Sequence, residues 1–261
     1  MILNSHSYYM NGALPLASKI LDHNEWDIIH TVSQLGEGPN YWSVGDYKTF
    51  TGRSGTQYAA TIVGFNQETS LFIPGGSGGI TFALSVPGTG VPKLFPGASI
   101  EATTFSSGGP TGPSSTKWTN SAYYKTGGLL ETISSDLPLY LNIFRISVDK
   151  KYAEVNPNGS YTSQGSFGLF VPSRTEIFGS SSDQYQYWAN GGTVPTGDFW
   201  LRDAYSYSWY DGTNGVRGIY KFYISKNGSV TNDGYTDKWN YAGSTGRTGT
   251  TTANIMVMFV L

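Results

Sequence analysis

The sequence predicts an α+β domain made of short antiparallel strands, a few short helices and long loops, with an N-terminal arm in front of it. Aromatic residues make up 15% of the 261 residues, charged residues only 13%, and 34 residues are glycine. This balance favours short strands joined by tight turns over long surface helices. The chain is also long enough to bury a substantial core.

Residues 1–22 are expected to form the arm, and residues 23–261 the domain. The first segment carries apolar side chains with no helical or strand period, among them Tyr8, Leu14 and Leu16. Such a segment is suited to dock on another surface and attach the protein to neighbouring subunits. The alternative is that it forms the first strand of the domain itself.

A short helix is expected directly after the arm. Asn24 is placed to cap it. Trp26, Ile29 and Val32 recur at the spacing of one helix face, so this face is expected to pack inward. The glycines that follow would end the helix near residue 36.

Strands and further helices are expected before residue 153. Segments 41–50 and 58–65 flank a glycine-containing turn, which predicts an antiparallel hairpin, and residues 80–84 are predicted as a further strand. The stretch 85–116 is rich in Gly, Pro, Ser and Thr and is predicted as an exposed loop. Within residues 118–152 the apolar spacing predicts two short helices that cover one face of the sheet.

The rest of the chain is organised around the stretch Phe199-Trp200-Leu201-Arg202. Trp200 is expected in the core. A buried arginine needs a carboxylate or carbonyl partner, and the neighbouring Asp198 or Asp203 is the expected partner of Arg202. Trp200 and Arg202 are therefore predicted to have structural roles.

Regular structure is also expected on both sides of this stretch. Residues 169–179 combine a strand-like run, a proline break and a short amphipathic segment that ends at glycine. Asn227-Gly228 is predicted as the turn of a hairpin. Residues 255–261 are continuously apolar and are predicted as a terminal strand that is buried on both faces.

The segments after Arg202 are the candidate recognition surface. Residues 203–217 and 235–247 are predicted as loops in which aromatic residues alternate with small polar ones, a composition typical of adaptable binding surfaces. Core packing of some of these rings is the alternative. The candidate ligand-binding residues are Tyr205, Tyr207, Trp209, Tyr210, Asp211, Asn214, Arg217, Tyr235, Trp239 and Tyr241.

Composition argues against several classes of partner. The formal net charge is −2 and the longest basic run is Lys150-Lys151, so nucleic acid is not an expected partner. No apolar window is long enough to insert into a membrane, and no signal peptide is evident, so we expect synthesis in the cytoplasm without cleavage. The sequence has no cysteine, which excludes disulfides and thiolate metal sites.

Catalysis is not expected either. The candidate acids, among them Asp203 and Asp211, lie in predicted turns, where aspartate commonly serves the backbone. The three histidines fall in the first 30 residues without metal-ligand spacing, and no nucleophile elbow surrounds a serine. We therefore expect no enzyme activity, no cofactor and no metal site.

The chain carries a series of landmarks spread over residues 24–261. They are Trp26, Tyr41-Trp42-Ser43-Val44-Gly45-Asp46-Tyr47-Lys48-Thr49, Ile62-Val63-Gly64-Phe65, Ile80-Thr81-Phe82, the run from Leu169 to Gly179, Phe199-Trp200-Leu201-Arg202, and Ser225-Lys226-Asn227-Gly228-Ser229-Val230. In order and spacing these landmarks resemble an uncharacterised C-type-lectin-like domain family of Gram-positive bacteria and their phages and prophages. Members of that family often belong to tail or surface proteins.

The resemblance implies a C-type-lectin-like fold and a phage or cell-surface setting. The chain departs from the family at Asn66-Gln67-Glu68, where relatives tend to carry a His-Asp pair, and at Met256-Val257, where they tend to carry Arg-Pro. The calcium-lectin triplets Glu-Pro-Asn and Gln-Pro-Asp are absent, and Trp239-Asn240-Tyr241 differs from the triplet Trp-Asn-Asp. The resemblance therefore does not imply calcium-dependent sugar binding.

Together these expectations describe a phage virion protein, tail- or capsid-associated, with an adhesin-like domain that binds the host surface. Its partners would be other virion subunits, bound through residues 1–22, and a glycan or protein of the host surface, and the chain would form a homo-oligomer. A purely architectural particle component is the alternative, and a cell-wall glycan hydrolase is a weaker one. The expected location is the virion.

Overall fold

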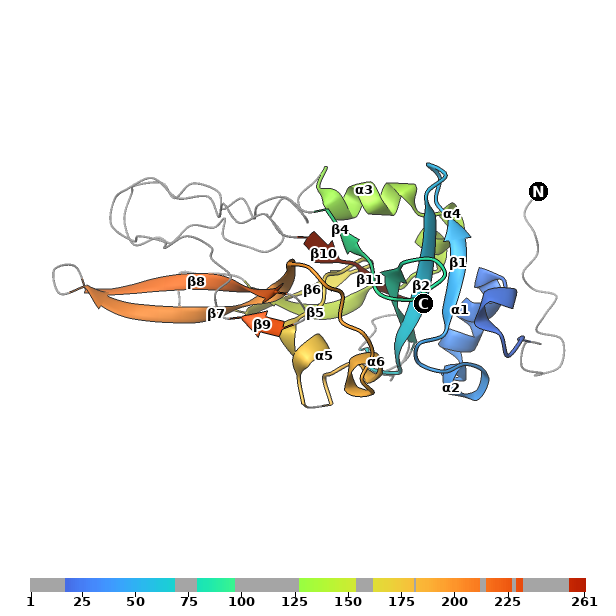
Figure 1. Ribbon diagram of the computed structural model, residues 1–261, viewed down its shortest axis with the longest axis horizontal. Helices are drawn as coiled ribbons and strands as arrows, with labels where there is room; N and C mark the ends of the chain where they lie inside the picture. Colours follow the sequence, from blue (N-terminus) through green and yellow to red (C-terminus); the bar gives the residue numbers. More distant parts are fainter. Residues whose placement is uncertain are drawn as a thin grey trace.

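A computed structural model describes residues 17–68, 79–96, 127–153, 162–180, 182–211, 215–226, 229–231 and 254–261. Over these residues the chain forms short helices and mainly antiparallel sheets, so the predicted α+β class is confirmed. Figure 1 shows the helices gathered around the sheets of the body and one long hairpin that extends away from it.

A four-stranded sheet forms the first layer of the body. Its strands, in spatial order, are β1 (Tyr47–Thr51), β2 (Gln57–Phe65), β3 (Ile80–Ser85) and β11 (Met258–Val260). All neighbours in it are antiparallel. The predicted hairpin and the predicted strand at residues 80–84 are therefore confirmed, although the first strand begins at Tyr47 rather than at residue 41.

A five-stranded sheet carries the long hairpin. Its strands, in spatial order, are β4 (Leu94–Phe95), β10 (Asn254–Met256), β7 (Phe199–Asp211), β8 (Gly215–Lys226) and β9 (Ser229–Thr231). β10 and β7 are parallel, while the other neighbours are antiparallel. Lys226 pairs with Ser229, which confirms the predicted hairpin at residues 227–228. A separate antiparallel pair joins β5 (Val148–Ala153) to β6 (Thr162–Phe167).

The C-terminal apolar run belongs to both large sheets. Successive side chains of a strand point to opposite faces, and here they alternate between two hydrophobic cores. The members are Ile255, Val257 and Phe259 in the first core, and Met256, Met258 and Val260 in the second. The run is buried on both faces, as predicted, but it forms two short strands in different sheets rather than one.

The helices are short and pack on the sheets. They are η2 (Leu21–His23), α1 (Trp26–Gln34), α2 (Gly38–Tyr41), α3 (Leu129–Asp136), α4 (Leu139–Phe144), α5 (Arg174–Phe178) and α6 (Gln186–Ala189). α1 buries the predicted apolar face, and α3 and α4 are the two helices expected between residues 118 and 152. The last residues of that range are not helical, since β5 begins at Val148.

The prediction that Asn24 caps the first helix is wrong. The residue before α1 is Glu25, and no side chain caps the helix. The Asn24 amide donates instead to the carbonyl oxygens of Ser18, Ile20 and Leu21, at 3.1, 2.9 and 3.3 Å. Asn24 therefore fixes the chain that enters the helix, because its side chain bonds to three carbonyl oxygens of that segment.

The last residues of the predicted arm pack on the domain. Leu21 is buried in the first core. The Trp42 indole donates to the carbonyl of Ser18 at 2.9 Å, and the backbone N–H of Thr49 donates to the Asp22 carboxylate at 2.6 Å. The described part of residues 1–22 thus belongs to the body, while residues 1–16 lie outside the described residues.

Gly79 allows the start of β3 to lie close to Val260 and Leu261, and a substitution at this glycine tests that close approach. Its φ is +95°, and an added Cβ would lie 2.7 Å from Val260 Cγ1 and 2.8 Å from the Leu261 carbonyl oxygen. Gly55 has a similar φ of +88°, with no described atom within 4 Å of an added Cβ. We expect Gly79→Ala to lower the free energy of unfolding by about 3 kcal/mol and Gly55→Ala by about 1 kcal/mol. Urea denaturation measures both, and equal losses would contradict the close approach.

Candidate functional site

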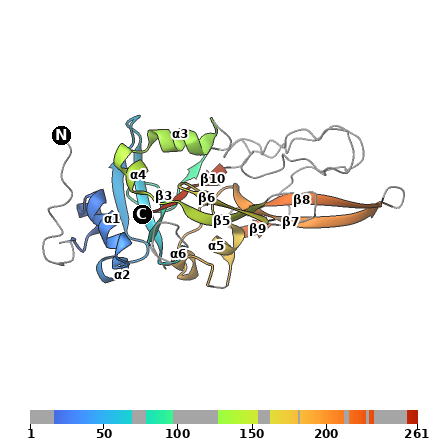
Figure 2. The same cartoon turned by 180° about the vertical axis from the view of Figure 1, so that it is seen from behind.

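The outer part of the β7–β8 hairpin extends beyond the body in both views (Figures 1 and 2). Residues 204–211 of β7 pair one to one with residues 215–222 of β8. The prediction of a loop over residues 203–217 is therefore wrong for 203–211 and 215–217. Aromatic residues at every second position follow the two-residue period of a strand, and the partner strand continues that period. The structure describes the backbone of this hairpin.

The register sorts the hairpin positions onto two faces. Directly opposed residues share a face, as do residues two apart along one strand. The first face, which we call the aromatic-charged face, carries Tyr205, Tyr207, Trp209, Asp211, Gly215, Arg217, Ile219 and Lys221. The second, which we call the uncharged face, carries Ala204, Ser206, Ser208, Tyr210, Val216, Gly218, Tyr220 and Phe222.

The register brings half of the candidate ligand-binding residues together. The aromatic-charged face holds Tyr205, Tyr207, Trp209, Asp211 and Arg217. Trp209 and Arg217 occupy directly opposed positions. Tyr210 falls on the uncharged face, so the strand period separates it from the others. Asn214, Tyr235, Trp239 and Tyr241 lie outside the described residues.

A large bulge marks the base of the hairpin. β7 pairs with β8 at Trp200↔Ile224 and again at Ala204↔Phe222, so three residues of β7 lie opposite one residue of β8. Bulges bend a strand and change the direction of its side chains. The backbone N–H of Arg202 donates to the carbonyl of Pro172 at 3.1 Å. The bulge thus links β7 to the segment that enters α5. Before it, Trp200 is fully buried in the first core.

Arg202 is held by Glu176 of α5. Its Nη1 and Nη2 lie 2.5 and 2.6 Å from the two carboxylate oxygens, a bidentate pair. The guanidinium also donates to the carbonyl oxygens of Val171 and Lys151, at 2.8 Å each. Sequence analysis expected Asp198 or Asp203 as the carboxylate and missed Glu176. The side chain of Asp203 lies outside the description.

A capping box positions Glu176. The backbone N–H of Ser173 donates to the Glu176 carboxylate at 2.8 Å, and the N–H of Glu176 donates to the Ser173 hydroxyl at 3.3 Å. The spacing Ser-x-x-Glu before a short helix was a visible signal for this motif. The same carboxylate therefore caps α5 and pairs with Arg202.

Lys150 extends the pair into a buried ionic cluster, defined here as Glu68, Lys150, Glu176, Tyr185 and Arg202. Lys150 Nζ lies 2.6 Å from a Glu68 carboxylate oxygen and 2.9 Å from a Glu176 oxygen. It also donates to the Tyr185 hydroxyl at 2.9 Å, and that hydroxyl donates to Glu68. All five residues are at most 7% exposed. Two carboxylates thus balance two cations, as buried charges require.

The cluster changes the pKa values of two of its members, Glu176 and Tyr185. Burial acts to raise the pKa of the Glu176 carboxyl, but the charges of Arg202 and Lys150 outweigh it and hold that pKa well below its usual range. Burial, followed by the charges of Glu176 and Glu68, raises the pKa of Tyr185 well above its ordinary value. An ionised Glu176 and a neutral Tyr185 at neutral pH suit a structural anchor rather than a proton-transfer site.

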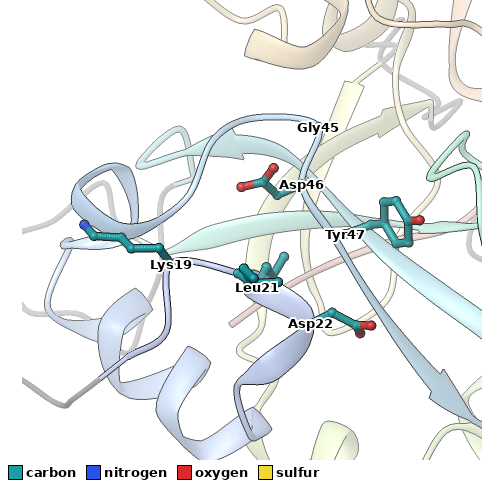
Figure 3. A pocket seen from close by; sticks show the side chains of 7 residues that line it. Lys19, Leu21, Asp22, Gly45, Asp46 and Tyr47 are labelled. Carbon is teal, nitrogen blue, oxygen red and sulfur yellow. The ribbon is translucent and has the colours of Figure 1, made fainter.

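A pocket of about 360 Å³ lies between the chain that forms η2 and the turn that leads into β1 (Figure 3). Its lining residues are Lys19, Ile20, Leu21, Asp22, Gly45, Asp46 and Tyr47. Its charged groups already have partners in the protein. Lys19 donates to the carbonyl of Asn40, Asp22 accepts from Thr49, and Asp46 accepts from the N–H of Ser43 at 2.9 Å. We therefore regard the hairpin, and not this pocket, as the candidate site.

Among the described residues, no group of three His, Cys, Asp or Glu side chains could hold a metal ion. The helices of the same residues are all too short or too polar to cross a membrane.

The cluster predicts a large loss of stability when one of its charges is removed. Arg202→Met leaves Glu176 buried with one cation fewer, so we expect the free energy of unfolding to fall by about 3–5 kcal/mol. Arg53 is exposed, and Arg53→Met is the matched control, with an expected change within about 0.5 kcal/mol. Urea denaturation compares the two variants, and a small loss in Arg202→Met would show that the cluster does not anchor β7.

The ion pairs also predict how stability depends on pH. The pKa of Glu176 is lower in the folded protein than its unfolded value of about 4.3, so its contribution is complete above that value and is lost as pH falls below it. We expect the free energy of unfolding to fall between about pH 5 and pH 3, and less steeply in Arg202→Met. Burial acts to raise the pKa of Asp136, but hydrogen bonds from Tyr58 and Ser54 lower it, equally in both proteins. Urea denaturation at several pH values gives the free energy of unfolding as a function of pH for both proteins. Equal slopes for the parent and Arg202→Met would contradict a contribution of the ion pair.

The landmarks of the sequence fall at structurally important places, since Trp26 opens α1 and Phe199 to Arg202 form the base of β7. Their resemblance to the C-type-lectin-like family stays a prediction. Comparisons with protein-family models, with curated proteins and with solved structures found no match to this chain.

Proposed function

We propose that this chain is a structural protein of a phage virion, tail- or capsid-associated, that binds the host surface through the β7–β8 hairpin. The domain would be C-type-lectin-like, and the ligand a glycan or protein of the host surface. The observation that supports this most is the aromatic-charged face. It places three aromatic residues, an aspartate and an arginine on one face of a hairpin that extends from the body (Figure 2).

The spacing of the aromatic positions suits an extended ligand. Residues two apart on a strand lie about 7 Å apart, so Tyr205, Tyr207 and Trp209 span about 14 Å. This is the length of an extended peptide of about four residues. Tyr and Trp offer large contact areas at low cost in side-chain entropy, while Asp211 and Arg217 would add directional hydrogen bonds. A linear glycan or peptide is therefore the ligand that the face fits best.

The buried ionic cluster at the base of the hairpin supports the proposed binding role. It ties β7 to α5 through Glu176 and to β5 through Lys150. Binding residues are held most precisely when their element is anchored to the scaffold. A hairpin that extends from the body needs such an anchor at its base, since a two-stranded ribbon alone is marginally stable.

The runner-up is a purely architectural component, whose aromatic-charged face would contact neighbouring subunits. The two proposals differ in whether the face is free in the assembled particle. Hydrolysis of cell-wall glycan is favoured by no observation. Glu68 and Glu176 are the carboxylates that the cluster brings together, and both are buried and paired with cations, which is unsuited to acid–base work on a sugar.

The other partners and the location are proposed from the sequence alone. Residues 1–22 would attach the protein to other virion subunits, although Ser18, Leu21 and Asp22 are packed on or bonded to the body. The protein would be made in the host cytoplasm, form a homo-oligomer and be located in the virion.

Truncation of single rings tests the binding face. We expect Tyr207→Ala or Trp209→Ala to weaken host-cell binding by about 30-fold or more, since central aromatic residues contribute about 2 kcal/mol or more at interfaces. Ile143→Ala is the matched control, because Ile143 is an exposed apolar residue on α4 in the body. Binding is measured on variants that keep the parent melting temperature. Unchanged binding in both hairpin variants would show that the receptor site lies elsewhere.

A further inference from the structure

The outer hairpin has no described partner other than itself. β9 pairs with β8 only at residues 224–226, and β10 pairs with β7 only at Phe199 and Trp200. Residues 204–211 and 215–222 are therefore paired, within the described chain, only with each other. A two-stranded ribbon is marginally stable in water unless a further strand or a packed face supports it. We therefore expect one face of the hairpin to pack against another part of a protein.

The uncharged face is the one suited to burial. Its eight positions include two tyrosines, a phenylalanine and a valine and carry no ionisable group that is charged at neutral pH. The opposite face carries Asp211, Arg217 and Lys221. The centres of protein interfaces are depleted in charged residues and enriched in aromatic ones. The charge difference therefore assigns the uncharged face to packing and leaves the aromatic-charged face for a ligand.

The sizes of the residues on the uncharged face indicate what covers it. On β7 the positions nearest the body are small, namely Ala204, Ser206 and Ser208, whereas on β8 the opposed positions include the large Phe222 and Tyr220. Toward the tip the order is reversed, since Tyr210 on β7 lies opposite the smaller Val216. A two-fold axis parallel to the strands places each β7 position of one copy over the paired β8 position of the other, so in three of the four pairs a large residue meets a smaller one.

We propose that the uncharged face of the β7–β8 hairpin is a self-association surface, on which the same face of a second copy of this chain packs. The two ribbons would lie face to face about 10 Å apart, as packed sheets do. The aromatic-charged faces of both copies would then point outward on opposite sides. This inference depends on the register and the residue sizes, and not on the proposed host-surface ligand.

The area of the ribbon sets the strength of the association. Two strands of eight paired residues offer about 300 Å² per copy. A standard interface buries about 800 Å² per partner. Association through the hairpin alone is therefore weak and depends on concentration, and it becomes strong when other contacts hold the copies together.

The test uses neighbouring positions on opposite faces of β8. Tyr220→Lys adds a charge to the uncharged face, and Ile219→Lys adds the same charge to the aromatic-charged face. Sedimentation velocity of the full chain from about 1 µM to about 1 mM should show a rising mass for the parent and for Ile219→Lys. Tyr220→Lys should associate at least about tenfold more weakly. Equal behaviour of the two variants, or a parent that stays monomeric throughout, would overturn the proposal.

Cysteine cross-linking gives a second readout that does not depend on folding stability. The chain has no cysteine, so a single introduced thiol reports on its own position. With a bifunctional thiol reagent that spans about 10 Å, the distance between packed sheets, Ser208→Cys should form a covalently linked dimer, while Tyr207→Cys, one residue away on the other face, should not. Equal cross-linking of the two, or none in either, would overturn the proposal and leave another segment of the chain as the cover of this face.

Discussion

The ion pair between Arg202 and Glu176 is the interaction on which the hairpin and its base depend. It lies where β7 leaves the body, and the side chains of Arg202 and Glu176 are 6% and 9% exposed. At such burial an unpaired charge is costly, so the pair forces β7, α5 and the bulge into one arrangement. Lys150 and Glu68 extend that constraint to β5 and to the chain after β2. The outer hairpin therefore extends from a base that these ion pairs hold in place.

Local patterns were sufficient to predict much of the fold. The hairpin of β1 and β2, the strand β3, the buried face of α1 and the two helices near residue 130 follow from short-range periodicity and glycine turns. Such local patterns could not predict the ionic cluster around Arg202, because its members are far apart in the sequence. Glu176 is 26 residues away, and Lys150 and Glu68 are 82 residues apart. Nearby aspartates were the natural guess, and no local rule brings α5 beside β7. Residues 66–68, which the family resemblance marked as a departure, contribute Glu68 to the cluster.

For the candidate site, too, the sequence could predict one part and not another. Its residue types could be chosen from the sequence, because rings set among small polar residues are typical of recognition surfaces. Their arrangement could not, since it depends on which residues face each other across two strands. The alternation Tyr205, Tyr207, Trp209 has the period of a strand, and its high content of serine and glycine neighbours led to a loop prediction instead. The register then separates Tyr210 from the others, and it sorts the outer hairpin into the aromatic-charged face and the uncharged face.

A reconstruction of the virion, with the position of this chain resolved, tests the central claim most directly. The account predicts that the β7–β8 hairpin points away from the particle, with the aromatic-charged face of residues 205–209 exposed to solvent. A hairpin directed into the particle, with that face covered by a different subunit, would contradict host-surface binding and favour the architectural role.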